Sequence, residues 1–131
     1  MARKSSDTLT TVELEFMEVL WADGEQNSDA VQRSLARKGR DLTDGSVRKM
    51  LQILLEKGQL TRRREGRSFL YTAKSQARHA KGRMVRDLVQ RVFRGSAPRL
   101  VASLFETQKV SDRDLAEIKR LIAEHEKGSK R

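Results

Sequence analysis

The 131-residue sequence contains no cysteine, one proline and one tryptophan, and aromatic residues make up only 5% of it. The absence of cysteine excludes disulfides, thiolate metal sites and cysteine nucleophiles. One proline and eight glycines argue against a disordered linker protein. No apolar run approaches the roughly 18 residues that cross a bilayer, and no signal-peptide segment follows the start MARKSSDTLT. We therefore expect a cytoplasmic protein without membrane insertion.

Motifs of enzymes and metal centres are also missing. The sequence has no G-x-S-x-G motif, no P-loop and no dinucleotide-binding fingerprint. Its two histidines, His79 and His125, lie far apart in the sequence and have no metal-ligand pattern beside them. We expect both to be solvated, and we expect no catalytic activity, no metal and no cofactor.

Positive charge is what the sequence has in excess. It carries 28 Lys and Arg against 18 Asp and Glu, for a formal net charge of +10 and a pI of about 10.5. Such a field attracts polyanions, which points to nucleic acid or an anionic membrane surface, and less strongly to acidic substrates. The length fits one globular domain, or one small domain with an added oligomerisation element.

Three short helices are expected in the first 58 residues. Thr10 is an N-cap, and Glu13 completes a capping box at the start of the first helix. A second helix begins after Ser28. A third follows Thr43 as its cap and stops at Gly58, because glycine suits the left-handed conformation that ends helices.

The stretch LTRRREGRSFLYT (residues 60–72) predicts a β-hairpin. Segments 60–64 and 67–72 flank a Glu-Gly pair, and Phe69 and Tyr71 alternate with other residues as in a half-buried strand, where we expect them in the core. The hairpin carries four arginines that repel one another: Arg62, Arg63, Arg64 and Arg67. A single arginine fits a solvated surface equally well, but four on one hairpin favour contact with phosphates.

Three further helices are expected. A long one spans residues 75–93. Ser96 caps the next, with Pro98 in its first turn, where a missing N–H does no harm. The last opens at Ser111 and gives way to a charged tail, residues 125–131.

This order of elements predicts a mainly α fold with a small β-hairpin, of the winged helix-turn-helix class. A winged-helix DNA-binding domain would occupy residues 1–75, and a helical dimerisation domain residues 76–131. The third helix would enter the major groove of DNA while the hairpin follows the backbone. The predicted DNA contacts are Thr43, Gly45, Ser46, Arg48, Lys49, Gln52, Arg62, Arg63, Arg64 and Arg67.

The third helix has side chains suited to reading bases. Gln52 matches the donor and acceptor pattern of adenine, and Lys49 or Arg48 matches guanine. Thr43 and Ser46, with the start of the helix, are suited to hold a phosphate.

Apolar stripes on the last three helices exceed what a short winged domain covers. Isologous pairing of two copies would bury them. The same stripes also fit an intramolecular bundle, and the sequence leaves both arrangements open. The residues expected at a dimer interface are Met84, Leu88, Val92, Leu100, Leu104, Phe105, Leu115, Ile118, Leu121 and Ile122.

Three segments together resemble the penicillinase-repressor family of bacterial transcription regulators, the BlaI/MecI group, to which copper-responsive CopY repressors are related. They are LTTVELEFMEVLW (residues 9–21), TDGSVRKMLQILLEKGQLTRRREGRSFLY (residues 43–71) and FRGSAPRLVASLFE (residues 93–106). The resemblance extends over roughly residues 9–124. It implies a homodimeric repressor on a palindromic operator, with C-terminal helices that intertwine two subunits.

The resemblance also implies a means of induction. In relatives that control β-lactam resistance, a membrane sensor-protease signals induction, and the repressor is cleaved within its dimerisation helices. The corresponding bond here joins Ser103 and Leu104. Ser103 stands where the best-known members have an asparagine. Copper sensing is disfavoured, because the copper-responsive branch uses C-terminal cysteine pairs and this chain has no cysteine.

Two other kinds of function fit the charge. A non-catalytic architectural or RNA-binding module would bind nucleic acid for charge and shape alone. A membrane-surface protein would need one helix with an apolar and a basic face and no partner.

Overall fold

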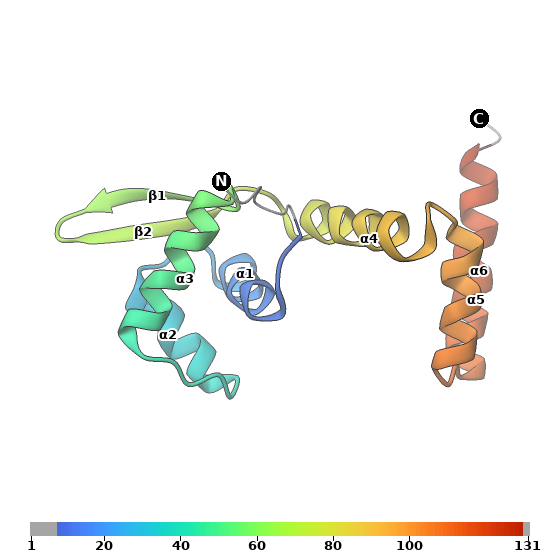
Figure 1. The fold of residues 1–131 in the computed structure, drawn as a ribbon, viewed down its shortest axis with the longest axis horizontal. Coiled ribbons are helices and arrows are strands. Elements are labelled where there is room, and N and C mark those ends of the chain that lie inside the picture. Colours follow the sequence, from blue (N-terminus) through green and yellow to red (C-terminus); the bar gives the residue numbers. More distant parts are fainter. Residues whose placement is uncertain (1–7, 130–131) are drawn as a thin grey trace. The chain divides into compact units, whose positions relative to one another are not determined.

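The computed structural model describes residues 8–129, which form six helices and a two-stranded antiparallel hairpin (Figure 1). Three helices precede the hairpin and three follow it, which confirms the predicted mainly α fold with a small β-hairpin. The chain divides into two compact units between Leu88 and Val89. We call the described parts the N-terminal unit (residues 8–88) and the C-terminal unit (residues 89–129). The predicted functional boundary after residue 75 stays a prediction.

Helix α1 (Thr11–Asp23) begins as the sequence predicts. Thr10 Oγ1 accepts a hydrogen bond from the Glu13 backbone N–H at 3.2 Å, and Glu13 Oε1 accepts one from the Thr10 N–H at 2.9 Å. This reciprocal pair is the expected capping box. The helix ends at Gly24, whose φ of 78° is a backbone conformation that glycine adopts with little strain because it has no Cβ atom.

Helices α2 (Ser28–Arg37) and α3 (Asp44–Glu56) follow. The cap of α2 is Asn27, whose Oδ1 accepts from the Ala30 N–H at 2.9 Å. The helix therefore includes Ser28, one residue earlier than expected, because asparagine caps as well as serine does. Thr43 caps α3 as predicted, and Gly58 follows it with a φ of 74°.

Strands β1 (Leu60–Glu65) and β2 (Ser68–Ala73) form the hairpin. Glu65 pairs with Ser68, so the turn is Gly66-Arg67 and lies one residue later than predicted. Gly66 has a φ of 61°, and a glycine with positive φ at the first turn position is typical of hairpin turns that match strand twist. Arg67 consequently lies in the turn.

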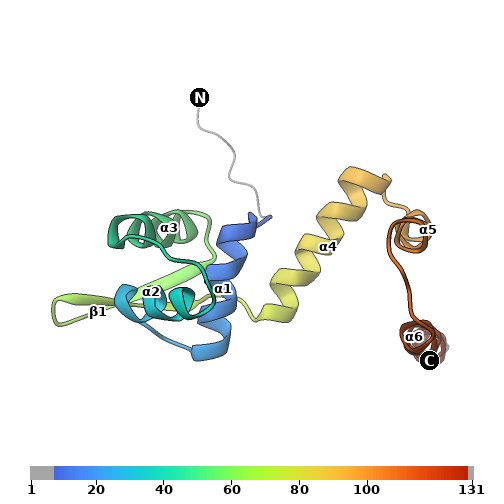
Figure 2. The same cartoon turned by 90° about the horizontal axis from the view of Figure 1, so that it is seen from below.

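One core holds the N-terminal unit together. Figure 2 shows α1, α2 and α3 gathered beside the hairpin. Tyr71 of β2 is buried among the side chains that meet there, as the sequence predicts. The buried cluster consists of Leu9, Phe16, Met17, Val19, Leu20, Val31, Leu35, Val47, Leu51, Leu54, Leu60 and Tyr71.

Helix α4 (Ala77–Phe93) continues from the N-terminal unit into the C-terminal unit. It begins two residues later than predicted. Ala80 is buried and Met84 packs against the core cluster. Arg94 and Gly95, with φ of 51° and 82°, end the helix at the predicted break.

The C-terminal unit contains the end of α4, α5 (Ala97–Thr107) and α6 (Asp112–Ser129). Ser96 caps α5 as predicted, accepting from the Arg99 N–H at 3.2 Å. The predicted charged tail is wrong for the residues before 130, because α6 continues to Ser129. Glutamate and lysine are good helix formers, so a charged segment extends a helix readily.

No residue of the C-terminal unit between 89 and 129 is buried. The backbones of α5 and α6 do not pack closely against each other, and Figure 2 shows them end on as separate helices. The large apolar side chains left exposed on α4, α5 and α6 are Val85, Leu88, Val92, Val101, Leu104, Phe105, Leu121 and Ile122.

Candidate nucleic-acid interface

One side of α3 is buried and the other carries the predicted base-reading residues. Val47, Leu51 and Leu54 are fully enclosed by the core. The opposite side exposes five residues of the predicted contact set: Gly45, Ser46, Arg48, Lys49 and Gln52. The helix is therefore fixed by packing while these groups remain accessible in the free protein.

Hydrogen bonds orient part of this exposed side. Thr43 Oγ1 accepts from the Ser46 N–H at 3.1 Å and donates to Ser46 Oγ at 2.9 Å. Gln52 Nε2 donates to Glu56 Oε1 at 3.2 Å, which leaves its carbonyl oxygen free of that contact. Arg48 and Lys49 take part in no ion pair among residues 8–129.

The arginines of β1 alternate between the two faces of the hairpin. Arg62 is paired with Tyr71 and Arg64 with Phe69, so these four side chains share one face. The guanidinium of Arg62 lies 4.1 Å from the centre of the Phe69 ring, and that of Arg64 lies 5.7 Å from it. Arg64 Nε also donates to the carbonyl of Gly66 at 3.2 Å. Phe69 thus holds two cations on this face.

Arg63 points to the other face and has a protein partner. It donates from Nε and Nη2 to the two carboxylate oxygens of Glu25, at 3.0 and 2.8 Å. Glu25 also accepts from Thr72 Oγ1 at 3.2 Å. The Arg63 hydrogen bonds lower the pKa of Glu25, and the carboxylate raises that of Arg63. One of the four predicted arginines is therefore already neutralised within the chain.

The loop between α1 and α2 is joined to the hairpin by more than this ion pair. Gln26 and Tyr71 exchange both backbone hydrogen bonds, at 3.1 and 2.8 Å. The Gln26 side chain is itself buried and donates to the Val19 and Gly24 carbonyls at 3.4 and 3.2 Å. Sequence reasoning missed Glu25 and Gln26, because no local spacing signals a contact with strands more than 30 residues away.

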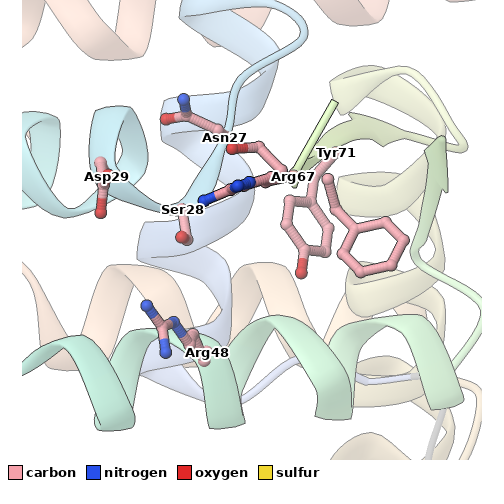
Figure 3. Close-up of a pocket in the computed structure, with 8 residues that line it drawn as sticks. Asn27, Ser28, Asp29, Arg48, Arg67 and Tyr71 are labelled. Atoms are coloured by element: carbon pink, nitrogen blue, oxygen red, sulfur yellow. The ribbon is translucent and has the colours of Figure 1, made fainter. Parts of the chain in front are cut away.

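A pocket of about 350 Å³ lies between the start of α2, the middle of α3 and the hairpin (Figure 3). Arg48 of α3 and Arg67 of the hairpin turn both line it, together with Tyr71. The first backbone N–H groups of α2, at Ser28 and Asp29, lack partners within the helix, and a helix start favours anions. The Asp29 carboxylate in the lining works against an anion.

This pocket brings together predicted residues from two elements and adds others. Arg48 and Arg67 were expected to contact DNA separately, at the helix and at the hairpin. Ser28, Asn27 and the hydroxyl end of Tyr71 were not expected to join them. Periodicity places a residue on a face of its own element, but it does not say which other element faces it.

The predicted dimerisation residues do not form one cluster. Met84 lies against the core of the N-terminal unit. A pocket of about 340 Å³ within the C-terminal unit joins others across α5 and α6, where Leu104, Phe105 and Ile118 line it. Both members of the Ser103-Leu104 bond lie inside α5, and the Ser103 carbonyl accepts from Thr107 Oγ1 at 2.7 Å.

In the part of the chain that the structure describes, no group of three or more His, Asp or Glu side chains is placed to hold a metal ion. Across the same residues, every helix is too short or too polar to cross a membrane.

Comparison with known proteins gives consistent matches over almost the whole chain. A family model described as "Penicillinase repressor" matches residues 9–124. The penicillinase repressor of Bacillus licheniformis is 25% identical over 127 residues, covering 97% of this chain and 98% of the relative. The methicillin resistance regulatory protein MecI of Staphylococcus aureus is 18% identical and covers 87% of this chain and 92% of its own length.

A solved structure shares the fold. The complex structure of hsRosR-S1 is 19% identical, with a TM-score of 0.52, and the match covers 94% of this chain and 96% of that one. The family model's match to residues 9–124 confirms the family resemblance noted in the sequence.

Proposed function

The chain belongs to the penicillinase repressor family, and from this premise we propose that it is a transcriptional repressor that binds a specific double-stranded DNA operator. The observation that carries the proposal is the convergence of cations on one unit. The exposed side of α3, two hairpin arginines on the Phe69 face and the pocket that Arg48 shares with Arg67 all belong to the N-terminal unit. DNA supplies the negative charge that these groups lack within the chain.

Base reading is assigned to the exposed side of α3. In the major groove, Gln52 presents an amide suited to adenine and Lys49 presents donors suited to guanine, whereas Arg48 lines the pocket that it shares with Arg67. Glu56 supports this role for Gln52 by accepting from its amide nitrogen, which limits how the amide turns. Gly45 leaves one position in the first turn of α3 without a side chain, so a phosphate can approach the backbone there, beside Thr43 and Ser46.

Phosphate binding is assigned to the hairpin and the pocket. Arg62 and Arg64 are held over Phe69 and offer guanidinium donors along the duplex backbone. In the pocket, Arg48, Arg67 and the start of α2 suit one phosphate group, because two guanidinium groups outweigh the single Asp29 carboxylate. These contacts would set the register of α3 on the duplex without reading sequence themselves.

We further propose that two copies pair through the C-terminal unit on a palindromic operator. The exposure of Leu104, Phe105 and Ile122, at 40%, 46% and 56%, supports this, since an apolar surface of that extent is costly in water. Within the described residues, no side chain fills the apolar pocket between α5 and α6. A second copy supplies complementary stripes by symmetry.

Induction by proteolysis completes the proposal. The B. licheniformis and S. aureus relatives are described as penicillinase and methicillin resistance regulators, which supports β-lactam resistance genes as the regulated class. Cleavage between Ser103 and Leu104, signalled by a membrane sensor-protease, would divide α5 and release its C-terminal end together with α6. Because the bond is inside a helix, α5 must open locally before it is cut.

The alternative is an architectural or RNA-binding module, which the net charge of +10 alone would explain. Selecting bound fragments from the host genome and competing them against random duplexes at one stated salt concentration separates the two. A repressor is expected to prefer its operator by about a thousandfold or more. Equal affinity for all duplexes, or tighter binding to RNA, would contradict the proposal.

The base-reading assignment has its own test in the same assay. Gln52→Ala and Lys49→Ala are expected to change which operator variants bind best, whereas Arg64→Ala should weaken all duplexes alike. A uniform loss from all three substitutions would assign α3 to backbone contact only.

A further inference from the structure

The first half of α4 carries a cationic surface that the proposed contacts leave unused. Arg78, His79, Arg83 and Arg86 surround Gly82 and line an open pocket of about 370 Å³. We call these five residues the α4 basic face. All of them belong to the N-terminal unit, which also contains α3 and the hairpin.

This face is turned away from the core. Ala80 is 3% exposed and Met84 packs on the buried cluster, so both mark the inner side of α4. Residues 78, 82 and 86 are spaced by four and lie on the opposite side of the helix. Lys81 forms an ion pair with Glu18 of α1 at 2.9 Å, which attaches the helix beside that face.

The charges of the α4 basic face are not neutralised within the described chain. Neither Arg78 nor Arg86 has an ion-pair or hydrogen-bond partner for its side chain among residues 8–129. Arg83 donates only to the uncharged Ser75 Oγ, at 3.4 Å. By contrast, Arg40 and Arg63 each reach a carboxylate within 3 Å. Three like charges held on neighbouring turns are stabilised by an anion from outside.

Gly82 gives a second and independent indication. It lies in the middle of α4, where glycine is disfavoured because it increases the entropy lost on forming the helix. A Cβ atom at this position would meet nothing within 4 Å, so packing within the chain does not require glycine. The missing side chain leaves an open floor between the arginines, where a phosphate backbone can approach the helix closely.

We propose that the α4 basic face binds backbone phosphates of duplex DNA outside the half-site that α3 contacts. The inference depends on the proposed function only in taking DNA as the partner. Guanidinium groups match phosphate oxygens in geometry as well as charge. Arg78 and Arg86 are eight residues apart, or about 12 Å along the helix axis, so they reach different phosphates. The contact adds affinity for all sequences and lengthens the stretch of duplex that one subunit covers.

The test measures binding of the full-length protein to a 40-base-pair random-sequence duplex over a range of salt concentrations. The variant Arg78→Gln with Arg86→Gln removes two cations from the face. Arg113→Gln with Lys119→Gln removes the same charge from exposed positions of α6 and serves as the matched control. The face variant is expected to lower the slope of log affinity against log salt by about two per subunit. Equal slopes for face variant and control would overturn the proposal and leave the face to an acidic protein partner.

Substitution of Gly82 tests the same surface with every arginine kept. Gly82→Ala adds a methyl group that meets no atom and favours the helix, so thermal melting should show a fold at least as stable as the parent. Gly82→Glu places a carboxylate among the arginines and is expected to lower the salt slope by about one per subunit. Unchanged binding by a folded Gly82→Glu protein would contradict the proposal.

The two proposals fail in different ways. If the parent protein shows no preference among duplex sequences, the repressor function is contradicted. The salt slopes of the face variant and its control still test the α4 basic face in that case. If the parent prefers an operator and the face variant behaves as its control, only the α4 inference fails. The preference for operator over random duplex is expected to stay within about twofold in the face variant, since phosphate contacts do not read bases.

Discussion

The two units of this chain use similar amphipathic helices to opposite effect. In the N-terminal unit, α2 and α3 turn their apolar sides toward α1 and close a core in which Phe16, Val31 and Leu51 are completely buried. In the C-terminal unit, α5 and α6 have equally regular apolar stripes, yet no residue from 89 to 129 is buried. The pattern of a helix therefore shows that it needs a partner surface, and not whether the same chain provides it.

The difference has a consequence for stability. An isolated helix of 11 residues such as α5 is marginal in water even with a good cap, because nucleation is costly. The N-terminal unit stabilises its helices by packing within the chain. In the proposed dimer, the C-terminal unit obtains the same stabilisation from a second copy of the chain.

The largest effect is expected from placing charge on the unpartnered stripes. Leu104→Glu with Leu121→Glu should give monomers, with the C-terminal helices partly unfolded, because two carboxylates cannot enter an apolar interface unpaired. Operator affinity should fall by a factor of about 10²–10⁴, since the second half-site no longer binds as part of one molecule. Sedimentation and a binding titration measure both. Arg99→Gln with Lys119→Gln lowers the net charge by the same two units at exposed positions and is the control. A dimer retained by the leucine variant would refute the interface.

A cavity in the closed core should cost less than loss of the dimer, yet more than any surface change. Leu51→Ala is expected to lower the unfolding free energy by about 2–5 kcal/mol, because Leu51 is fully enclosed. In the monomeric variant with Leu104→Glu and Leu121→Glu, the further substitution Ile122→Ala should change the unfolding free energy by less than about 0.5 kcal/mol. Urea unfolding gives both values. Similar losses at the two sites would mean that the C-terminal unit has a core of its own.

The ion pair between Glu13 and Lys57 offers an intermediate effect that depends on pH. Glu13 is 3% exposed, and Lys57 Nζ donates to its Oε1 at 2.8 Å. Burial raises the pKa of Glu13, but the hydrogen bonds from Lys57 and the Thr10 N–H bring it below its ordinary value of 4.5. A carboxylate with a lowered folded-state pKa stabilises the protein above the unfolded-state pKa, and this stabilisation is lost as pH falls through the folded-state value.

Lys57→Met should therefore destabilise the protein by about 1–3 kcal/mol at neutral pH, because a buried acceptor loses its charged donor. The difference from the parent should shrink as the pH falls through the lowered folded-state pKa of Glu13, because protonation removes the charge that Lys57 stabilises. Arg40→Met, which removes the partner of the more accessible Glu15, is the control and should cost less. Urea unfolding from pH 3 to 8 provides the measurement. A deficit that stays constant with pH would exclude the electrostatic explanation.

The smallest effect compares two arginines of one strand. Arg63→Ala should weaken DNA binding less than Arg64→Ala, because Glu25 already neutralises Arg63. The salt slope should fall by about one for Arg64→Ala and by less for Arg63→Ala. Hydrogen exchange of the hairpin amides should instead be faster in Arg63→Ala, since the pair with Glu25 joins the hairpin to the α1–α2 loop. Equal slopes for the two variants would show that DNA displaces Glu25.

Sequence reasoning succeeded where the signal and the structure lie within a few residues of each other. Thr10, Thr43 and Ser96 are N-caps as predicted, because a cap binds the N–H three residues ahead. Helix starts are displaced by one residue where two neighbours have the same preference for the N-cap position, as Asn27 and Ser28 do. The charge of residues 125–131 predicts a tail, yet α6 extends to Ser129, because glutamate and lysine favour a helix.

Contacts between distant segments were beyond local reasoning. Arg62, Arg63 and Arg64 are chemically identical in the sequence. In the structure, contact with the α1–α2 loop gives Arg63 a carboxylate, while its two neighbours lie over Phe69. The pocket shared by Arg48 and Arg67 likewise requires α2, α3 and the hairpin to meet. No spacing in the chain encodes such a meeting.

The sequence by itself determined the helices and the hairpin, the excess of positive charge and the family, since each depends on residues close together or on their order along the chain. Tertiary structure alone decided which arginines remain without a carboxylate partner, which apolar stripes close a core and which stay exposed. The physical reason is that electrostatic and apolar interactions depend on how far apart two groups lie in space, and not on how far apart they lie along the chain. Residues brought together by folding therefore acquire properties that none of them has in its own segment.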